Sequence, residues 1–265
     1  MDKPLLILKT GTPDQRTKER VGDYDDWFVR ALRRAPRWAA MRTARRPIRV
    51  HDLTQGVRPC LEPAMVIVTG APESVYDPLP WIETASAYIR DLIEEEIPLL
   101  GVCFGHQLVA RAMGGRVAPN PRGWEIGTTI LQLTPAGRRD PLLGRLPVPC
   151  VVQVSHRDSV VDIPDGWVSL ASTAIEPHHA FRVGPASWTL QFHPEVDEPE
   201  VRALLASKAE VLHREGEADG LAPGAFVERA ARGIRASEVG ALLLGRFVEL
   251  AEAYWTERET RGRSS

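Results

Sequence analysis

Residues 98–107 read PLLGVCFGHQ, a short apolar run that leads into a cysteine flanked by glycines at positions 101 and 105. The run has the length and composition of a buried strand, and a helical pattern begins after Gly105. Cys103 is therefore expected on a sharp strand-to-helix turn at the carboxyl end of a strand, the arrangement of a nucleophile elbow. A helix N-terminus favours the thiolate, which is the nucleophilic form. The alternative is a small buried apolar residue, as most free cysteines are.

The segments on either side of this turn predict the rest of the sheet. Residues 5–8, 48–53 and 64–68 have strand character, and residues 23–32, 81–96 and 106–113 have helical character. Strands and helices that alternate in this way imply right-handed crossovers and parallel pairing. The predicted fold class is therefore α/β, with a mostly parallel central sheet flanked by helices.

The pattern changes after residue 116. Short β-type runs predict an antiparallel extension and the last strands of the central sheet, at 127–133, 148–155, 168–172, 180–183 and 188–192. From residue 199 the pattern predicts two or three helices that end in 239–255, followed by a polar tail, 256–265, that is expected to be frayed. We expect one α/β domain over residues 1–198 and a C-terminal helical appendage over 199–265 that packs on the same domain.

The composition is that of a globular protein, with 43% hydrophobic residues to form a core. A formal net charge of -2 gives no reason to expect nucleic acid or an acidic membrane as a partner. We find neither a secretory signal nor a run of the roughly 18 apolar residues that span a bilayer, so a cytoplasmic location is expected. The cysteines, Cys60, Cys103 and Cys150, form no CxxC pair, which argues against disulfides and a zinc site.

A second segment, WTLQFHPE at residues 188–195, carries the polar groups that a cysteine nucleophile needs. His193 follows an apolar strand and is expected at the carboxyl edge of the sheet, where its imidazole can take a proton from Cys103. Glu195 can accept a hydrogen bond from the other ring nitrogen and fix the tautomer. A His-x-Glu pair alone also fits an ordinary polar loop, so the interpretation depends on both segments together.

Together these segments resemble the class I glutamine amidotransferases, and most closely the glutaminase domain of GMP synthases. The matching motifs occur in the family's order within residues 5–195: TGAPESVYD at 69–77, GVCFGHQ at 101–107, VSHRDSV at 154–160 and QFHPE at 191–195. The resemblance implies the flavodoxin-like fold of that family, with an antiparallel β extension.

The resemblance also implies roles for individual residues. Cys103 would be the nucleophile, His193 the general base and then acid, and Glu195 the residue that orients His193. The main-chain N–H groups of Ala71 and Phe104 would form the oxyanion hole, although the family usually has glycine at the position of Ala71. The 155–158 segment would hold the α-amino and α-carboxylate groups of glutamine. The residues expected to contact the substrate are Gly70, Gln107, Ser155 and His156.

The implied reaction is hydrolysis of the γ-carboxamide of glutamine, a glutaminase activity that yields glutamate and ammonia. The Cys103 thiolate attacks the carbonyl carbon, ammonia leaves, and water releases glutamate from a γ-glutamyl thioester. This chemistry requires no metal and no organic cofactor. His178 and His179 are not expected to bind a metal together, because adjacent residues on a strand point to opposite faces.

The sequence leaves the fate of the ammonia open. We find no ATP-pyrophosphatase signature and no phosphate-binding glycine-rich loop, and three interpretations follow. The chain is a glutaminase that supplies a separate synthase or acceptor protein, a free-standing hydrolase of another γ-glutamyl compound, or a non-catalytic regulatory module. The charged segment 16–21 is a candidate for a loop that overhangs the site and selects the substrate.

Overall fold

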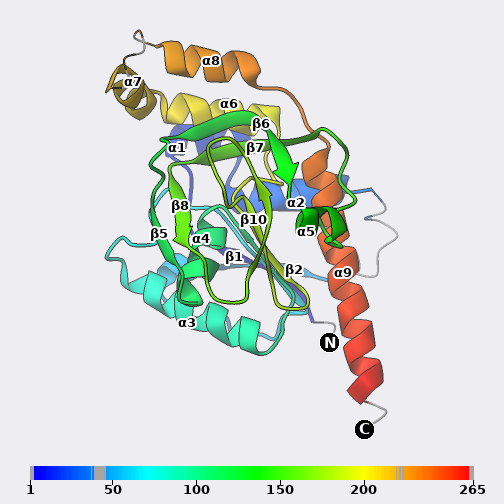
Figure 1. Cartoon of the computed structure of the whole chain (residues 1–265). Helices are drawn as coiled ribbons and strands as arrows, with labels where there is room; N and C mark the ends of the chain where they lie inside the picture. Colours follow the sequence, from blue (N-terminus) through cyan, green and yellow to red (C-terminus); the bar gives the residue numbers. More distant parts are fainter. Residues whose placement is uncertain are drawn as a thin grey trace.

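A central sheet organises the computed structural model, which describes residues 3–36, 38, 46–218, 220, 222 and 224–262 (Figure 1). Within these residues the sheet has nine strands in the order β2-β1-β3-β4-β11-β10-β9-β6-β7. It is parallel from β2 to β11 and antiparallel from β11 to β7. Two further strands, β5 and β8, pair as a separate antiparallel ribbon. The strands are β1 (Leu5–Lys9), β2 (Ile48–Asp52), β3 (Met65–Val68), β4 (Leu99–Val102), β5 (Arg116–Pro119), β6 (Glu125–Leu133), β7 (Cys150–His156), β8 (Asp158–Asp162), β9 (Val168–Ser172), β10 (Ala180–Val183) and β11 (Ser187–Leu190).

Helices cover both faces of the parallel half of the sheet. Successive strand residues point to opposite faces, and Leu5 and Ile7 of β1 accordingly share a core cluster with Phe28 of α2. Leu6 and Leu8 instead join the cluster that contains the apolar residues of α3 and α4. The helices are α1 (Gln15–Val21), α2 (Tyr24–Arg34), η3 (Leu53–Gln55), α3 (Pro80–Glu94), α4 (Phe104–Ala112), α5 (Pro135–Arg139), α6 (Glu198–Ser207), α7 (Ala209–Ala218), α8 (Ala225–Gly233) and α9 (Val239–Gly262).

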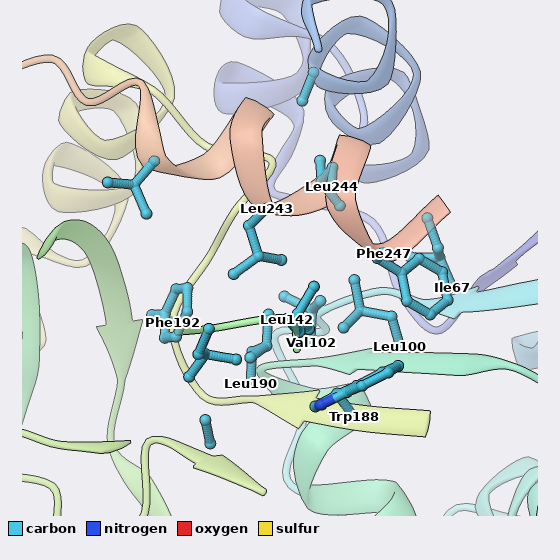
Figure 2. Close-up of a cluster of buried hydrophobic side chains, with 14 of the residues drawn as sticks. Ile67, Leu100, Val102, Leu142, Trp188, Leu190, Phe192, Leu243, Leu244 and Phe247 are labelled. Carbon is cyan, nitrogen blue, oxygen red and sulfur yellow. The ribbon is translucent and has the colours of Figure 1, made fainter. Parts of the chain in front are cut away.

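The long C-terminal helix α9 packs directly on the sheet. Figure 2 shows Leu243, Leu244 and Phe247 of α9 above Leu100 of β4 and Trp188 of β11. All five side chains are buried, and all belong to one core cluster. Burial of a leucine or phenylalanine side chain stabilises a fold by about 1.5–3 kcal/mol. We therefore propose that residues 199–265 fold together with the α/β domain on which they pack.

The predicted fold class is confirmed, and the main differences lie near the ends of the chain. The segment 16–21 is not a loop but part of α1, because Asp14 caps that helix by accepting from the backbone N–H of Thr17 at 3.0 Å. Helix α1 packs on α6. The structure also contains the β5-β8 ribbon and the short helix α5, which the sequence patterns did not indicate.

The C-terminal segment is more helical than predicted. The described part of residues 198–262 forms α6, α7, α8 and α9, where two or three helices were expected. The expectation of a frayed tail is wrong for residues 256–262, which continue α9, and residues 263–265 lie outside the described part. Within this extension the hydroxyls of Thr256 and Thr260 donate to carbonyls one turn earlier, at 2.9 and 2.8 Å, which satisfies both hydroxyls inside the helix. None of the helices that the structure describes is long and apolar enough to cross a membrane.

Candidate active site

Cys103 occupies the predicted turn between β4 and α4. Its backbone has φ 53° and ψ -106°, and the only other described residue with positive φ that is not glycine is Glu96. Such a conformation costs about 1–3 kcal/mol and persists only where the surroundings impose it. Close packing supplies that constraint: a Cβ on Gly105 would lie 2.5 Å from the Val68 carbonyl oxygen, and one on Gly101 would lie 2.7 Å from the Gly105 carbonyl oxygen. The two glycines let the turn approach β3, and the thiol is held at the edge of the sheet.

His193 reaches the same edge because β4 and β11 are parallel neighbours. Leu100 pairs with Trp188 and Val102 with Leu190, so both strands end side by side. The backbone N–H of His193 donates to the Gln153 carbonyl at 2.9 Å. A Cβ placed on Gly70 would lie 3.4 Å from His193 Cε1 and 3.7 Å from Cys103 Cβ. The side chains of His193 and Cys103 therefore both lie against Gly70, which is buried.

Glu195 fixes the orientation of the His193 ring. His193 Nδ1 lies 2.7 Å from Glu195 Oε1, and a carboxylate can only accept, so Nδ1 carries the proton. His193 Nε2 is buried and has no hydrogen-bond partner among the described residues. The ring thus presents an unused nitrogen at the position where a proton acceptor for the Cys103 thiol is needed.

The protonation of Cys103 and His193 is coupled. Burial is the largest influence and alone would raise the pKa of the Cys103 thiol, but the charge and hydrogen bond of His193 together with the charge of His156 lower that pKa below its usual value. Burial alone would lower the pKa of His193, but the carboxylate of Glu195 and the charge on Cys103 raise it well above its usual value. Both shifts favour the form in which Cys103 is a thiolate and His193 an imidazolium.

Two backbone N–H groups beside Cys103 are free to donate. No described group accepts a hydrogen bond from the N–H of Ala71, in the loop after β3, or of Phe104, the first residue of α4. Ala71 has no positive φ, so its methyl group causes no backbone strain. Ala71 and Phe104 line a pocket together with Cys103. This pocket has the donors that an oxyanion requires.

The pocket over Cys103 has a volume of about 430 Å³. Gln107, Ser155 and His156, which are expected to contact the substrate, line this pocket, whereas buried Gly70 is not part of its lining. Gln107 Nε2 donates to the Asp158 carbonyl at 3.1 Å and to Gln191 Oε1 at 2.9 Å, so its amide holds the 155–158 segment in place. The wall also includes residues that the sequence patterns did not single out, among them Trp124, Lys208 and Glu215.

A buried cluster behind the pocket was not predicted. Glu125 Oε2 accepts from His156 Nε2 at 3.0 Å and from His179 Nε2 at 2.8 Å, while Oε1 accepts from the Thr173 hydroxyl at 2.7 Å. Burial would raise the pKa of Glu125, but these donors hold it below its usual range. One ligand atom from each of Glu125, His156 and His179 lies within 4.8 Å of the others, a set that could bind a metal. The hydrogen bonds already satisfy these atoms, so the cluster needs no ion to explain it.

The reason given for excluding a metal at His178 and His179 does not hold in the structure. Strand β10 begins at Ala180, so the two histidines do not alternate on a strand. His179 turns to Glu125, and His178 instead stacks on Phe181 with ring centroids 5.6 Å apart. The cluster of Glu125, His156 and His179 could not be predicted from the sequence, because each residue is a single polar residue in or beside a β-type run. The three meet only when their strands come together in the fold.

Removal of the Glu125 carboxylate is expected to destabilise the fold strongly. Glu125→Ala would leave the imidazoles of His156 and His179 buried without their acceptor, at an expected cost of about 3–5 kcal/mol in the free energy of unfolding. Urea denaturation measures this change. Glu83→Ala is the matched control, because its ion pair with Arg111 leaves the Glu83 side chain 72% exposed and should contribute only about 0–1 kcal/mol. Equal losses for the two variants would contradict this role of Glu125.

Helix α9 contacts the turn that carries His193 and Glu195. A Cβ on Gly240 would lie 2.1 Å from the Pro194 carbonyl oxygen, which is part of the rigid backbone. Gly240→Ala is therefore expected to destabilise the fold by about 1–3 kcal/mol through overpacking. Gly233→Ala, where a Cβ would meet nothing within 4 Å, serves as the control and should be neutral or stabilising in the same urea titration. A neutral Gly240→Ala variant would show that this contact does not constrain the turn.

Comparison with known proteins identifies relatives of this chain. The family model described as glutamine amidotransferase class-I matches residues 21–209. Over 142 residues the chain is 33% identical to a glutamine amidotransferase-like protein of Schizosaccharomyces pombe, covering 53% of this chain and 56% of that one. Over 148 residues it is 34% identical to the glutamine-hydrolysing GMP synthase of Bacillus subtilis, covering 55% of this chain and 27% of that enzyme. The chain thus spans about half of the first relative and about a quarter of the second.

Solved structures show the same fold. A glutamine amidotransferase from Thermotoga maritima superposes with a TM-score of 0.63 at 21% identity, over 95% of this chain and 100% of that one. A glutamine amidotransferase from Methylobacillus flagellatus gives a TM-score of 0.62 at 21% identity, over 97% of this chain and 95% of that one. The family match extends over more than half of the sequence and includes Cys103, His193 and Glu195. The chain belongs to the class I glutamine amidotransferase family.

Proposed function

We propose that this chain hydrolyses γ-glutamyl amides with Cys103, His193 and Glu195 as its catalytic residues, and that glutamine is a substrate. The observation that carries the proposal is that the His193 ring and the Cys103 side chain approach the same point beside Gly70. Glu195 holds the imidazole by the 2.7 Å contact to Nδ1, so that Nε2 is the nitrogen available for proton transfer. This is the division of roles that a thiol nucleophile with a histidine base requires.

The reaction follows from these groups. The Cys103 thiolate attacks the γ-carboxamide carbon, and the N–H groups of Ala71 and Phe104 stabilise the negative oxygen that forms. The imidazolium of His193 then gives its proton to the departing amine, which leaves as ammonia when the substrate is glutamine. His193, now neutral, takes a proton from water, which attacks the γ-glutamyl thioester and releases glutamate. Each oxyanion-hole donor contributes about 3–4 kcal/mol in comparable sites.

Two roles are proposed for this hydrolysis. The first role is to supply ammonia to a separate synthase or acceptor protein. GMP synthases are among the relatives, and this chain spans only about a quarter of such an enzyme. The second role is that of a free-standing hydrolase of larger γ-glutamyl compounds. The pocket volume of about 430 Å³ supports this role, because glutamine would fill only part of the pocket.

The test is glutamate release by the purified chain, first with glutamine and then with a series of γ-glutamyl amides, with Cys103→Ser as the blank. Cys103-dependent glutamate release is expected. If neither glutamine nor any γ-glutamyl amide is hydrolysed, alone or with a synthase domain added, the catalytic proposal is contradicted and the non-catalytic interpretation takes its place.

A further inference from the structure

Lys208 is a pocket residue whose ammonium group forms no ion pair with any described residue. It caps the C-terminus of α6, is half-buried, and lines the same pocket as Cys103. No carboxylate or hydrogen-bond acceptor contacts its ammonium group among the described residues; the group lies instead 5.3 Å from the centroid of the Trp124 ring. A desolvated ammonium is unfavourable unless it is paired.

Trp124 provides a second donor without a partner. Its ring forms part of the pocket wall, and its Nε1–H is buried with no acceptor among the described residues. Buried indole N–H groups usually have a hydrogen-bond partner. A ligand that accepts hydrogen bonds and carries negative charge would satisfy both the ammonium and the N–H, which lie on neighbouring side chains of one pocket.

The other charged groups of the pocket do not compete for Lys208. Arg157 pairs with Glu215 at 3.2 Å, which neutralises both. The Asp158 carboxylate accepts from the hydroxyls of Ser74, at 2.5 Å, and of Tyr76, at 3.0 Å. Glu73 is exposed. Burial lowers the pKa of Lys208, and the negative charges of Cys103 and Asp14 offset that lowering only in part.

We propose that Lys208 and Trp124 form a subsite for a carboxylate on the leaving amine, so that the preferred substrates are γ-glutamyl amino acids or peptides. The proposal rests on the function given above and names its substrate class. The γ-carbonyl must lie at Cys103 with its α-groups near the 155–158 segment, which leaves the side of the pocket formed by α6 and Trp124 for the amine that departs. A carboxylate can accept from the ammonium and the indole together.

A pair of ligands that differ only in that carboxylate tests the proposal. Binding of γ-glutamylglycine and γ-glutamylglycinamide is measured by calorimetry with the intact chain carrying Cys103→Ala, which prevents turnover. We expect the acid to bind about tenfold more tightly than the amide. Adding Lys208→Met should reduce that preference to about twofold or less, whereas Lys208→Arg should retain most of it.

Three outcomes would overturn the subsite. The first is equal affinity for the two ligands in the Cys103→Ala parent, and the second is no measurable binding of either ligand. The third is an equal loss of affinity for both ligands in Lys208→Met, which would assign Lys208 to the α-carboxylate. Failure of the proposed function is seen separately, because it is read as absence of glutamate release by the wild-type chain. The Kd ratio in the inactive variant does not depend on turnover.

Discussion

Replacement of Cys103 by serine is expected to lower the kcat for glutamate release by a factor on the order of 10⁴ or more. A serine hydroxyl is not ionised by the neighbouring His193, whereas the thiol already has a lowered pKa in this setting. The two side chains are nearly the same size, so the fold should be unaffected. Glutamate release is followed in an enzyme-coupled assay, and circular dichroism and the urea midpoint confirm that the variant is folded.

Cys60→Ser is the matched control for this substitution. Cys60 is exposed and does not line the pocket, so its replacement should leave kcat unchanged. Substantial activity in a folded Cys103→Ser variant, or a loss of the same size in Cys60→Ser, would reject Cys103 as the nucleophile.

Replacement of His193 by glutamine is expected to have an effect of similar size, a factor on the order of 10⁴ in kcat. The substitution removes both the proton acceptor and the positive charge that lowers the pKa of Cys103. The burial that remains raises a thiol pKa. The pKa of Cys103 should therefore rise above its usual value in this variant, while it lies below that value in the wild type.

The pH dependence of Cys103 alkylation by iodoacetamide measures this shift. In the wild type the alkylation rate should reach its plateau at a pH below the usual pKa of a thiol. In His193→Gln the increase of the alkylation rate with pH should occur at higher pH.

The same coupling predicts that wild-type kcat/KM falls on the alkaline side only at a pH well above the usual histidine pKa, since imidazolium must protonate the leaving amine. The exposed residue His213 supplies the control, and a His213→Gln variant should keep both profiles. An unchanged alkylation profile in His193→Gln would contradict the coupled pair.

The part of the site that could be predicted from the sequence is the part with local signals. The apolar run before Cys103 and the glycines around it predict the turn, and the glycine contacts with Val68 and Gly105 give the physical reason. His193 could be placed because parallel strands end at a common edge, and the pairing of β4 with β11 brings the two ends together. These predictions depend on short-range pattern and on sheet topology alone.

The remainder depends on contacts between distant segments. Lys208 and Trp124 enter the pocket from α6 and from the turn before β6, and neither lies in a recognisable motif. Glu125 meets its histidines only because β6, β7 and the start of β10 converge. Segment 16–21 is helical rather than a loop because Asp14 caps α1, and α1 packs on α6.

The central claim is that Cys103 is the nucleophile of a glutamine-binding pocket, and covalent labelling tests it most directly. The wild-type protein is treated with a diazoketone analogue of glutamine, digested, and mapped by mass spectrometry. One equivalent of label is predicted on the peptide that contains Cys103, with glutamine protecting it, and none on exposed Cys60 or on Cys150, whose pKa burial raises to about 11. Label on another residue, or no label on Cys103 in folded protein, would contradict the account.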